Sequence, residues 1–460
     1  MSDFSVTGRH VVVVGGARSG VAAAELLASR GARVTLTDLK VNLPDEKRLA
    51  GAGIALELGA HDTRTFESAD LVVVSPGVPL RQPALDRARR AKVPIIGEVE
   101  LAWRWLQGRV IAITGTKGKS TTTTLVGKIL RAAGLHAPVS GNIGAPLAAA
   151  VEGSTADTIH VVEVSSFQLE TTNTFRPWIA ALLNLSTDHL DRHANFHEYA
   201  TAKARVFANQ GEGDWSVVNA DDQPAMNLAA KHAKARKRLF AIDASLAEGT
   251  VLSDEWIVER APGSPDVPLV PVNEVRLLGR HLLSDVAAAA TFARLAGAPP
   301  DAIRRAVSEF GGLEHALEPV MVIAGIRFIN DSKATNVESA RRAIESFEGR
   351  LVPIVGGRFK GGDLRDLRPA LQGRAKAIIA IGEARPTLHQ ALGDMLAVVE
   401  AGSMAEAVRA ALAAAPPGGT VLLAPACASF DMFRDYAERG RVFKREVLRL
   451  AEEIDGHPER

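Results

Sequence analysis

The sequence feature that most constrains the fold is a glycine-rich loop, residues 115–121, which stands between two patterned segments. The apolar run before it, residues 110–114, is typical of a buried strand, and residues 122–130 after it have the pattern of a helix. Backbone N–H groups in such a loop, together with the positive end of the helix, bind phosphate oxygens. The segment predicts a nucleotide site in which Lys119 neutralises terminal phosphates and Ser120 ligates Mg²⁺. The residues assigned to ATP are Gly115, Thr116, Lys117, Gly118, Lys119, Ser120 and Thr121.

Length and composition restrict the class of protein. A chain of 460 residues is long enough for about two to four domains. A net charge of +1 provides no field that would attract nucleic acid or an anionic membrane. No apolar run reaches the ~20 residues that span a bilayer, and the N-terminus lacks a signal-peptide pattern. The single cysteine, Cys427, excludes an internal disulfide framework. These features predict a cytoplasmic protein with no nucleic-acid or membrane partner, and we also expect a monomer.

Alternating strand and helix patterns predict an α/β fold of three domains with mainly parallel sheets. We expect a Rossmann-like domain over residues 1–95, a central ATPase domain over 96–312 and a Rossmann-like C-terminal domain over 313–460. An alanine-rich helix is predicted over residues 279–297. The predicted strands cover residues 10–14, 33–38, 71–78, 110–114, 160–166, 180–185, 327–331, 351–357, 377–382 and 421–425.

The first strand ends in a glycine-rich turn, residues 15–20, and the second strand ends in Asp38. This arrangement is typical of a nucleotide site at the carboxyl ends of parallel strands. The glycine pattern departs from the dinucleotide-binding one, because Ala17 stands where the second glycine belongs. A redox cofactor is the alternative interpretation, but nothing later in the chain indicates hydride chemistry.

Three polar positions of the central domain are candidates for metal and substrate chemistry. Glu163 ends an apolar strand; such an acid is usually structural, but next to a phosphate loop it is a candidate Mg²⁺ ligand. Asp188 and His189 follow another apolar strand, where they could simply begin a helix. Lys203 lies in a helical stretch, which by itself predicts a solvated surface charge.

Polar clusters also follow the predicted strands of the C-terminal domain. Residues 331–336 come after one strand, and Thr335 and Asn336 there could be a helix cap. A glycine loop, residues 356–363, carries Lys360, which could pair with a substrate carboxylate. Cys427 is predicted to be a packed small residue rather than a nucleophile.

Several of these motifs resemble the Mur ligase family, and in particular its D-glutamate-adding branch. The phosphate loop has the family's short form, because Ile113 replaces the first glycine of the common pattern. Residues 163–170 (Glu-Val-Ser-Ser-Phe-Gln-Leu-Glu) and residues 331–336 (Asp-Ser-Lys-Ala-Thr-Asn) resemble this branch rather than its sister ligases. The resemblance spans essentially the whole chain. Positions that depart from the residues usual in the family are Lys117, Leu282, Asp285, Ala316 and Phe359.

The resemblance implies an ATP-dependent amide ligase that adds D-glutamate to UDP-N-acetylmuramoyl-L-alanine through an acyl phosphate, with Mg²⁺, in peptidoglycan precursor synthesis. It places His189 beside the metal and the substrate carboxylate, with Asp188 holding its ring, and it makes Lys203 a carbamylated metal ligand. The catalytic set is then Lys119, Glu163, His189 and Lys203, and the metal ligands are Ser120, Glu163, His189 and Lys203.

The resemblance also assigns the remaining substrate contacts to all three domains. Asp331 and Asn336 would meet ATP. The UDP-substrate would contact Arg18, Ser19, Asp38, Ser75, Gly77, Asn142, Ser165 and Gln168. D-Glutamate would contact His189, Lys333, Thr335, Lys360, Ser429 and Phe430.

Two alternatives stay open at this level. A folylpolyglutamate synthase-type ligase or another Mur ligase shares the phosphate loop, but should lack the motifs at residues 163–170 and 331–336. A non-enzymatic nucleotide-binding regulator belongs to a different class. Such a switch would not need a lysine in the third domain that faces an acidic substrate.

Overall fold

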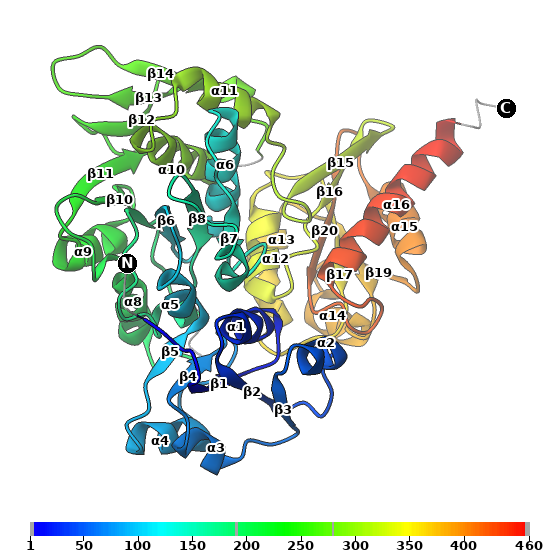
Figure 1. Cartoon of the computed structure of the whole chain (residues 1–460). Coiled ribbons are helices and arrows are strands. Elements are labelled where there is room, and N and C mark those ends of the chain that lie inside the picture. Colours follow the sequence, from blue (N-terminus) through cyan, green and yellow to red (C-terminus); the bar gives the residue numbers. More distant parts are fainter. Residues whose placement is uncertain (1–3, 189–191, 278–279, 456–460) are drawn as a thin grey trace. The chain divides into compact units, whose positions relative to one another are not determined.

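A computed structural model describes residues 4–188, 192–277 and 280–455 of the chain (Figure 1). The chain divides into two compact units. Unit 1 comprises Met1–Val275 and His281–Glu309, and unit 2 comprises Arg276–Arg280 and Phe310–Arg460. Unit 1 contains two sheets and unit 2 contains one. The prediction of three α/β domains is therefore confirmed, while the boundaries at residues 95 and 312 stay predictions.

The first sheet has five strands in the order β3-β2-β1-β4-β5, all paired in parallel. The chain leaves β1 toward β2 on one side and returns through β4 on the other, which opens a crevice at the carboxyl ends of β1 and β4. The strands are β1 (His10–Val14), β2 (Arg33–Asp38), β3 (Ala55–Leu58), β4 (Leu71–Val74) and β5 (Ile95–Gly97). The helices are α1 (Arg18–Ser29), α2 (Glu46–Gly51), α3 (Thr63–Glu67), α4 (Pro83–Arg90) and α5 (Glu98–Trp103).

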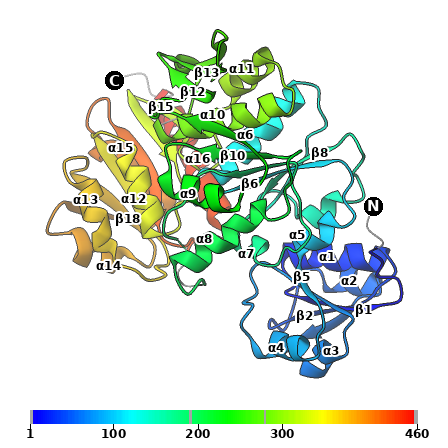
Figure 2. The same cartoon turned by 90° about the vertical axis from the view of Figure 1, so that its left-hand side faces the viewer.

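Alternate residues of β1 enter two different cores. Val11 and Val13 pack with residues of α1 and α2, whereas Val12 and Val14 pack with residues of α3 and α4. Figure 2 shows α1 and α2 on one face of this sheet and α3 and α4 on the other. Because both faces are covered, β1 is apolar throughout, as expected for a central parallel strand.

The turn after β1 depends on a close backbone approach at Gly20 in the first turn of α1. A β-carbon at Gly20 would come 1.7 Å from the carbonyl oxygen of Gly15, so no other residue fits there without moving the helix. Ala17, the departure from the dinucleotide pattern, is the N-cap residue of α1, with an extended backbone that any residue adopts.

The second sheet has nine strands in the order β14-β13-β12-β11-β10-β9-β6-β8-β7. Strands β6 to β12 pair in parallel, but β12, β13 and β14 form an antiparallel meander. The sheet is therefore mainly parallel, as predicted, with an antiparallel edge that the sequence analysis did not indicate. The strands are β6 (Arg109–Thr114), β7 (Val139–Gly141), β8 (Ile159–Glu163), β9 (Ile179–Leu182), β10 (Trp215–Asn219), β11 (Arg236–Ala241), β12 (Gly249–Ser253), β13 (Trp256–Arg260) and β14 (Val267–Pro271).

The helices of this part of unit 1 connect and cover the second sheet. The phosphate loop lies between β6 and α6, as predicted. The α-helices are α6 (Lys119–Ala132), α7 (Ser166–Leu169), α8 (Phe196–Ala204), α9 (Gln223–His232), α10 (Arg280–Leu295) and α11 (Pro300–Glu309), and the 3₁₀ helices are η1 (Leu147–Ala150), η2 (Arg205–Phe207) and η3 (Val272–Glu274).

The sheet of unit 2 has six strands in the order β15-β16-β20-β17-β18-β19, of which only β15 is antiparallel to its neighbour. The last strand, β20, lies between β16 and β17. The strands are β15 (Glu318–Ile323), β16 (Ile326–Asn330), β17 (Leu351–Gly356), β18 (Ala377–Ile381), β19 (Ala397–Ala401) and β20 (Thr420–Ala426). The helices are α12 (Val337–Glu345), η4 (Leu364–Leu367), α13 (Arg368–Leu371), α14 (Arg385–Leu392), α15 (Met404–Ala414) and α16 (Tyr436–Asp455).

A buried carboxyl lies where the first sheet leads into the second. Glu98, the first residue of α5, is 1% exposed, and its Oε1 accepts the backbone N–H of Ala148 at 2.6 Å. Its Oε2 is buried without a hydrogen-bond partner among the described residues. Burial raises the pKa of Glu98 to about 7. The hydrogen bond from Ala148 stabilises the charged carboxylate and so opposes this rise.

We expect Glu98→Gln to stabilise the protein at pH 8 but not at pH 5. As pH rises through the range between the unfolded pKa and about 7, the unfolded chain releases a proton that the folded chain still holds, so the wild type loses stability. The amide does not titrate, and the difference should reach at most about 3 kcal/mol above pH 7. Urea unfolding of both proteins at the two pH values measures it. The surface variant Glu152→Gln is the control, and an equal difference at both pH values would contradict the expectation.

Candidate functional site

The phosphate loop connects the carboxyl end of β6 to the first turn of α6. Gly118, the N-cap residue of α6, has φ +78°, a left-handed conformation that favours glycine. The first N–H groups of an α-helix have no carbonyl partner within the helix, so the start of α6 has the geometry of an anion site. The predicted residues 115–121 thus form one loop and helix start, and the side chain of Lys119 turns back over it, with Nζ 2.9 Å from the carbonyl oxygen of Thr116.

The loop is held from the neighbouring strand by Asn184. The Asn184 side-chain oxygen accepts the N–H groups of Thr116 at 3.1 Å and Lys117 at 2.8 Å, and its amide donates to the Lys117 carbonyl at 3.1 Å. The sequence interpretation did not single out Asn184. It follows β9, which pairs directly with β6, so the order of strands in the sheet brings it to the loop.

Asp285 of α10 also lies against the loop. A β-carbon at Gly118 would come 2.1 Å from Asp285 Oδ1, so the carboxyl group rests on the glycine. Burial raises the pKa of Asp285 well above its usual value, and the nearby Lys119 opposes this shift. The sequence interpretation noted Asp285 only as a departure from the family pattern.

Lys203 is buried beneath the phosphate loop, so the interpretation of this lysine as a surface charge is wrong. The residue is 2% exposed, and its Nζ donates to the carbonyl oxygen of Gly115 at 2.7 Å. The ammonium also lies 4.7 Å from the centre of the Tyr199 ring. Burial, and then the charge of Lys119, lowers the pKa of Lys203 well below its usual value, which favours the neutral amine.

Glu163, at the end of β8, is 1% exposed. Its Oε1 accepts the side-chain amide of Asn142 at 2.7 Å, while its Oε2 is buried without a hydrogen-bond partner among the described residues. Strand β8 pairs with β6, so Glu163 belongs to the same end of the sheet as the phosphate loop. A buried carboxylate oxygen that lacks a protein donor is suited to a cation.

The donor set fits a metal ion only together with oxygen ligands from elsewhere. Across residues 4–188, 192–277 and 280–455, no group of three or more His, Cys, Asp or Glu side chains could hold a metal ion. Mg²⁺ commonly takes one or two carboxylates and completes its octahedron with phosphate oxygens and water. Glu163 offers one such carboxylate oxygen, and the Ser120 hydroxyl belongs to the first turn of α6, beside the phosphate loop. His189 lies outside the described residues.

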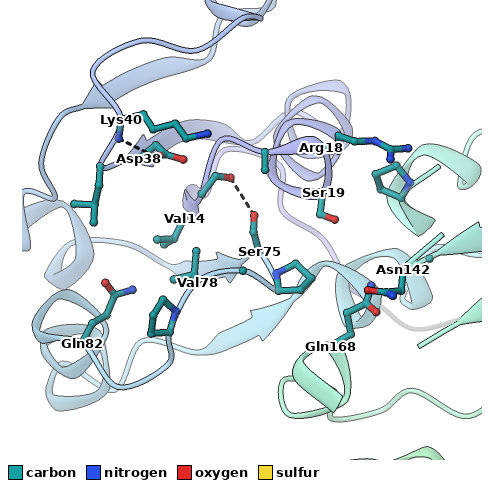
Figure 3. Close-up of a pocket in the computed structure, with 18 of the residues that line it drawn as sticks. Val14, Arg18, Ser19, Asp38, Lys40, Ser75, Val78, Gln82, Asn142 and Gln168 are labelled. Carbon is teal, nitrogen blue, oxygen red and sulfur yellow. Dashed lines mark hydrogen bonds between the residues drawn. The ribbon is translucent and has the colours of Figure 1, made fainter. Parts of the chain in front are cut away.

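Apart from the phosphate loop, unit 1 has a hollow of about 490 Å³ at the carboxyl ends of β1 and β4 (Figure 3). It contains every residue predicted to contact a UDP-substrate except Ser165. Figure 3 shows that Asn142 and Gln168 reach it from the side of the second sheet, while Asp38 and Ser75 belong to the first. The predicted residues that line the hollow are Arg18, Ser19, Asp38, Ser75, Gly77, Asn142 and Gln168.

Several lining groups of this hollow are held by hydrogen bonds. The Asp38 carboxylate accepts the N–H groups of Gly16 at 2.6 Å and Lys40 at 2.8 Å. The Ser75 hydroxyl donates to the Gly15 carbonyl at 3.0 Å. Ser165 instead caps α7 in a reciprocal pair with Gln168, whose Oε1 accepts the Ser165 N–H at 2.9 Å. Ser165 therefore orients a lining residue.

In unit 2, the predicted residues follow the carboxyl ends of three adjacent parallel strands. Residues 331–335 follow β16, residues 427–430 follow β20, and residues 357–360 follow β17. The loops after β17 and β20 are joined by reciprocal backbone hydrogen bonds between Arg358 and Ala428, at 2.9 and 3.0 Å. Because β20 lies between strands that precede it in the chain, this is the reversal point at which α/β sheets bind ligands.

The side chains at this edge differ in exposure. Lys333, Lys360 and Phe430 are exposed, whereas Ser429 is 2% exposed. Asp331 is buried, accepts the Leu317 N–H at 3.1 Å, and has its pKa raised by burial to about 7. The Thr335 side chain is half-buried.

Two residues of this region have clear structural roles. The Asn336 side chain caps α12 by accepting the Ser339 N–H at 2.8 Å, in agreement with the simpler interpretation. Arg439 of α16, to which the sequence interpretation assigned no role, is fully buried. Its guanidinium donates to the carbonyl oxygens of Ser332 at 2.9 Å and Cys427 at 3.1 Å, and so ties two of the three loops together.

Three protein-family models match most of the chain. Residues 9–97 match the Mur ligase MurD-like N-terminal domain, residues 113–293 the Mur ligase middle domain, and residues 315–427 the Mur ligase glutamate ligase domain. Each match includes most strands of one sheet. The chain belongs to the Mur ligase family.

Individual relatives show which members of the family this chain resembles. A UDP-N-acetylmuramoylalanine–D-glutamate ligase of Acidobacterium capsulatum is 47% identical over 449 residues, 97% of each chain. The ligase of the same name from Koribacter versatilis is 43% identical over 453 residues, 98% of this chain and 99% of the relative. The solved UDP-N-acetylmuramate-alanine ligase MurC of Thermotoga maritima has a TM-score of 0.59 at 19% identity and covers 96% of this chain and 100% of its own, which shows a shared fold.

The helices were also compared with the length and apolar character of membrane spans. In the part of the chain that the structure describes, no helix combines the length and the apolar character needed to cross a membrane.

We expect Gly118→Ala to weaken nucleotide binding at least tenfold. Both the left-handed backbone and the contact with Asp285 Oδ1 would force the loop to move, and a displacement of about 1 Å in a positioned group costs up to ~10²-fold in rate. Calorimetric titration with a non-hydrolysable ATP analogue measures the affinity.

The matched control is Gly134→Ala, just after the other end of α6. Gly134 has φ +80°, so it incurs the same backbone strain, but an added β-carbon meets nothing within 4 Å. It should lose about 1–2 kcal/mol of stability and keep its affinity. Equal nucleotide affinity in the two variants would show that the contact with Asp285 is unimportant.

Proposed function

We propose that this chain is an ATP-dependent amide ligase that joins D-glutamate to UDP-N-acetylmuramoyl-L-alanine in peptidoglycan precursor synthesis. The observation that carries the proposal is the 47% identity, over 97% of both chains, with a UDP-N-acetylmuramoylalanine–D-glutamate ligase. Mur ligases are ATP-dependent, and the phosphate loop before α6 supplies the site for the triphosphate.

The UDP-substrate is assigned to the hollow at the carboxyl ends of β1 and β4. Its volume of about 490 Å³ lies within the range of small-molecule sites. The backbone N–H groups and polar side chains around Arg18, Ser19 and Asn142 suit a diphosphate and sugar. The neighbouring Gln168 and Glu163 lie toward the phosphate loop end of the second sheet, where the alanyl carboxylate must react.

Mg²⁺ is assigned to Glu163 and Ser120, with His189 and a carbamylated Lys203 as further ligands. The unpartnered Oε2 of Glu163 supports the first assignment. When bound, the ion supplies positive charge that stabilises the transferring phosphoryl group. Asn142 fixes the carboxylate of Glu163 through its 2.7 Å hydrogen bond.

The carbamate on Lys203 is supported by the burial of its amine. A carbamate forms when a neutral amine attacks CO₂ and loses a proton, and the low pKa of Lys203 provides that neutral form. The product would place an anionic oxygen next to the phosphate loop. A ¹³C carbamate resonance after exchange with labelled bicarbonate, absent in Lys203→Ala, tests this assignment directly.

Glutamate is assigned to the three loops of unit 2, with Lys360, Lys333 and Ser429 as contacts and Thr335 and Phe430 beside them. Asp331 and Asn336 remain candidates for ATP contacts. In the reaction, an oxygen of the alanyl carboxylate attacks the γ-phosphorus and ADP leaves. The glutamate amine then attacks the carbonyl carbon of the acyl phosphate, and the tetrahedral intermediate loses its proton and expels phosphate. Lys119 stabilises charge in the first step, and the loops orient the amine for the second.

A purified-protein assay of phosphate release tests the function. Release should require ATP, UDP-N-acetylmuramoyl-L-alanine and D-glutamate together, and L-glutamate should not replace the D-isomer. A folate-type acceptor that supports release would favour the folylpolyglutamate synthase alternative, and release that ignores both acceptor and amino acid would favour a nucleotide-binding regulator. Sedimentation of the same sample tests the proposed monomer, and fractionation of the source cells tests the proposed cytoplasmic location.

We expect Glu163→Gln to shift the Mg²⁺ dependence of phosphate release to at least tenfold higher concentration. The amide keeps the shape of the side chain but removes the charge that would hold the ion, and a buried charged interaction is worth several kcal/mol. Titration with MgCl₂ at fixed ATP measures the shift. The control is Glu170→Gln, because Glu170 belongs to the same motif but lies 3.2 Å from His193 Nδ1. Equal Mg²⁺ dependence in the two variants would remove the metal assignment.

We expect Lys360→Ala to raise the KM for glutamate by roughly 10- to 100-fold, because a hydrogen bond to a charged group is worth about 1.5–3 kcal/mol. Lys360 is exposed, so its partner is a solvated carboxylate rather than a buried one. The KM for ATP should change far less. Steady-state kinetics measure both values, with Arg365→Ala, an exposed cation paired with Asp363, as the control. An unchanged glutamate KM would contradict the assignment.

A further inference from the structure

The loop that follows β4 is tied to the second sheet by one arginine. Residues 76–79, here called the rim loop, line the hollow assigned to the UDP-substrate. Arg192 donates from Nη1 to the Gly77 carbonyl at 3.1 Å, and from Nη2 to the carbonyls of Val78 at 3.2 Å and Pro76 at 3.4 Å. A single guanidinium therefore satisfies three consecutive carbonyls of the rim loop.

The guanidinium is itself held in place by the second sheet. Its centre lies 4.5 Å from the centre of the Phe167 ring, over the ring face. Phe167 belongs to α7, the short helix that Ser165 caps and that carries Gln168 into the same hollow. Arginine presents its donors in a fixed plane, so a ring beneath it restricts the directions in which they point.

The next residue, His193, anchors this segment. It is 2% exposed and stacks on the same Phe167 ring that contacts Arg192, with ring centroids 5.4 Å apart. Its Nε2 lies 3.0 Å from the Ser166 hydroxyl, and its Nδ1 lies 3.2 Å from Glu170. The backbone that presents Arg192 is therefore fixed to α7 by stacking and by polar contacts at both ring nitrogens.

Further side-chain contacts lead from His193 to the phosphate loop. The rings of His193 and Tyr199 form a T-shaped pair with centroids 5.3 Å apart. The Tyr199 hydroxyl lies 3.1 Å from the Thr116 hydroxyl, and the buried Lys203 lies over the Tyr199 ring. One packed series, rim loop–Arg192–Phe167–His193–Tyr199–Thr116, joins the rim of the hollow to the loop that would hold ATP.

We propose that Arg192 is a positioning residue that sets the rim loop of the UDP-substrate hollow at a fixed distance from the phosphate loop. The inference rests on the proposed function for the identity of the two ligands. Loss of the three hydrogen bonds frees the rim loop while the phosphate loop, held separately by Asn184, keeps its shape. Binding of the UDP-substrate then weakens, and binding of ATP does not.

A nearby ion pair also links the segment after the rim loop to the second sheet, but it is too exposed to position the loop as Arg192 does. Arg81, two residues beyond the rim loop, pairs with Glu198 of α8 at 3.0 Å, but their side chains are 81% and 41% exposed. Exposed pairs of this kind contribute about 0–1 kcal/mol. Arg192 thus provides the principal polar tie between the rim loop and the second sheet within the described residues.

The experiment uses Arg192→Lys, which retains the charge but lacks the planar set of donors. We expect the Kd for UDP-N-acetylmuramoyl-L-alanine, measured by calorimetry without turnover, to rise about tenfold or more, since several hydrogen bonds to the loop are lost. The Kd for a non-hydrolysable ATP analogue should change less than about twofold. The KM values should show the same split.

The control is Arg205→Lys in the same region. Arg205 also donates to carbonyls, those of Leu169 and Thr172, but both belong to the second-sheet side and not to the rim loop. It should leave both affinities unchanged. A folded Arg192→Lys protein with unchanged UDP-substrate affinity, or with equal weakening of both ligands, would overturn the inference.

A second variant keeps the test decisive if Arg192→Lys does not fold. Phe167→Leu removes the ring beneath the guanidinium and should weaken UDP-substrate binding about threefold, again without affecting the ATP analogue. Unchanged affinity there overturns the inference. If the wild-type protein binds no UDP-substrate at all, the proposed function fails as well, which separates that result from a failure of the positioning role alone.

Discussion

The side chain of Asn184 is the interaction on which the geometry of the proposed active site depends. It hydrogen-bonds both the N–H groups and a carbonyl of the phosphate loop, and it reaches them because β9 pairs with β6. Glu163 arrives from β8 on the other side of β6. The proposed active site is thus built around the carboxyl end of β6. The neighbouring strands β9 and β8 bring Asn184 and Glu163 to it.

Around this strand end the protein buries ionisable groups that it does not fully compensate. Among the described residues, the hydrogen bonds of Lys203 go to the neutral oxygens of Thr114 and Gly115, and one oxygen of Glu163 has no donor there. Asp285 is buried against Gly118. Each arrangement costs folding free energy, and such groups concentrate where a ligand later provides the missing partner.

Much of this site was predictable from the sequence because its residues stand at strand ends or in glycine loops, which local patterns indicate. The burial of Lys203 was not, since a nine-residue helix, α8, shows no clear apolar face. The roles of Asn184 and Arg192 were not predicted, because they arise from strand order and from a tie between two sheets. The antiparallel strands β12–β14 were missed because Trp256–Arg260 and Val267–Pro271 are short and only partly apolar.

The position of β20 in the third sheet has a consequence for how the chain is made. This strand is the last in sequence among the described residues, yet it hydrogen-bonds on both sides, to β16 and to β17, and so separates two strands that were synthesised earlier. The earlier strands cannot close into their final order without it. Until residues up to Ala426 have been translated, the strand that joins β16 to β17 is missing. The sheet of unit 2 can therefore be completed only after Ala426 has been synthesised, whereas both sheets of unit 1 have all their described strands by Pro271.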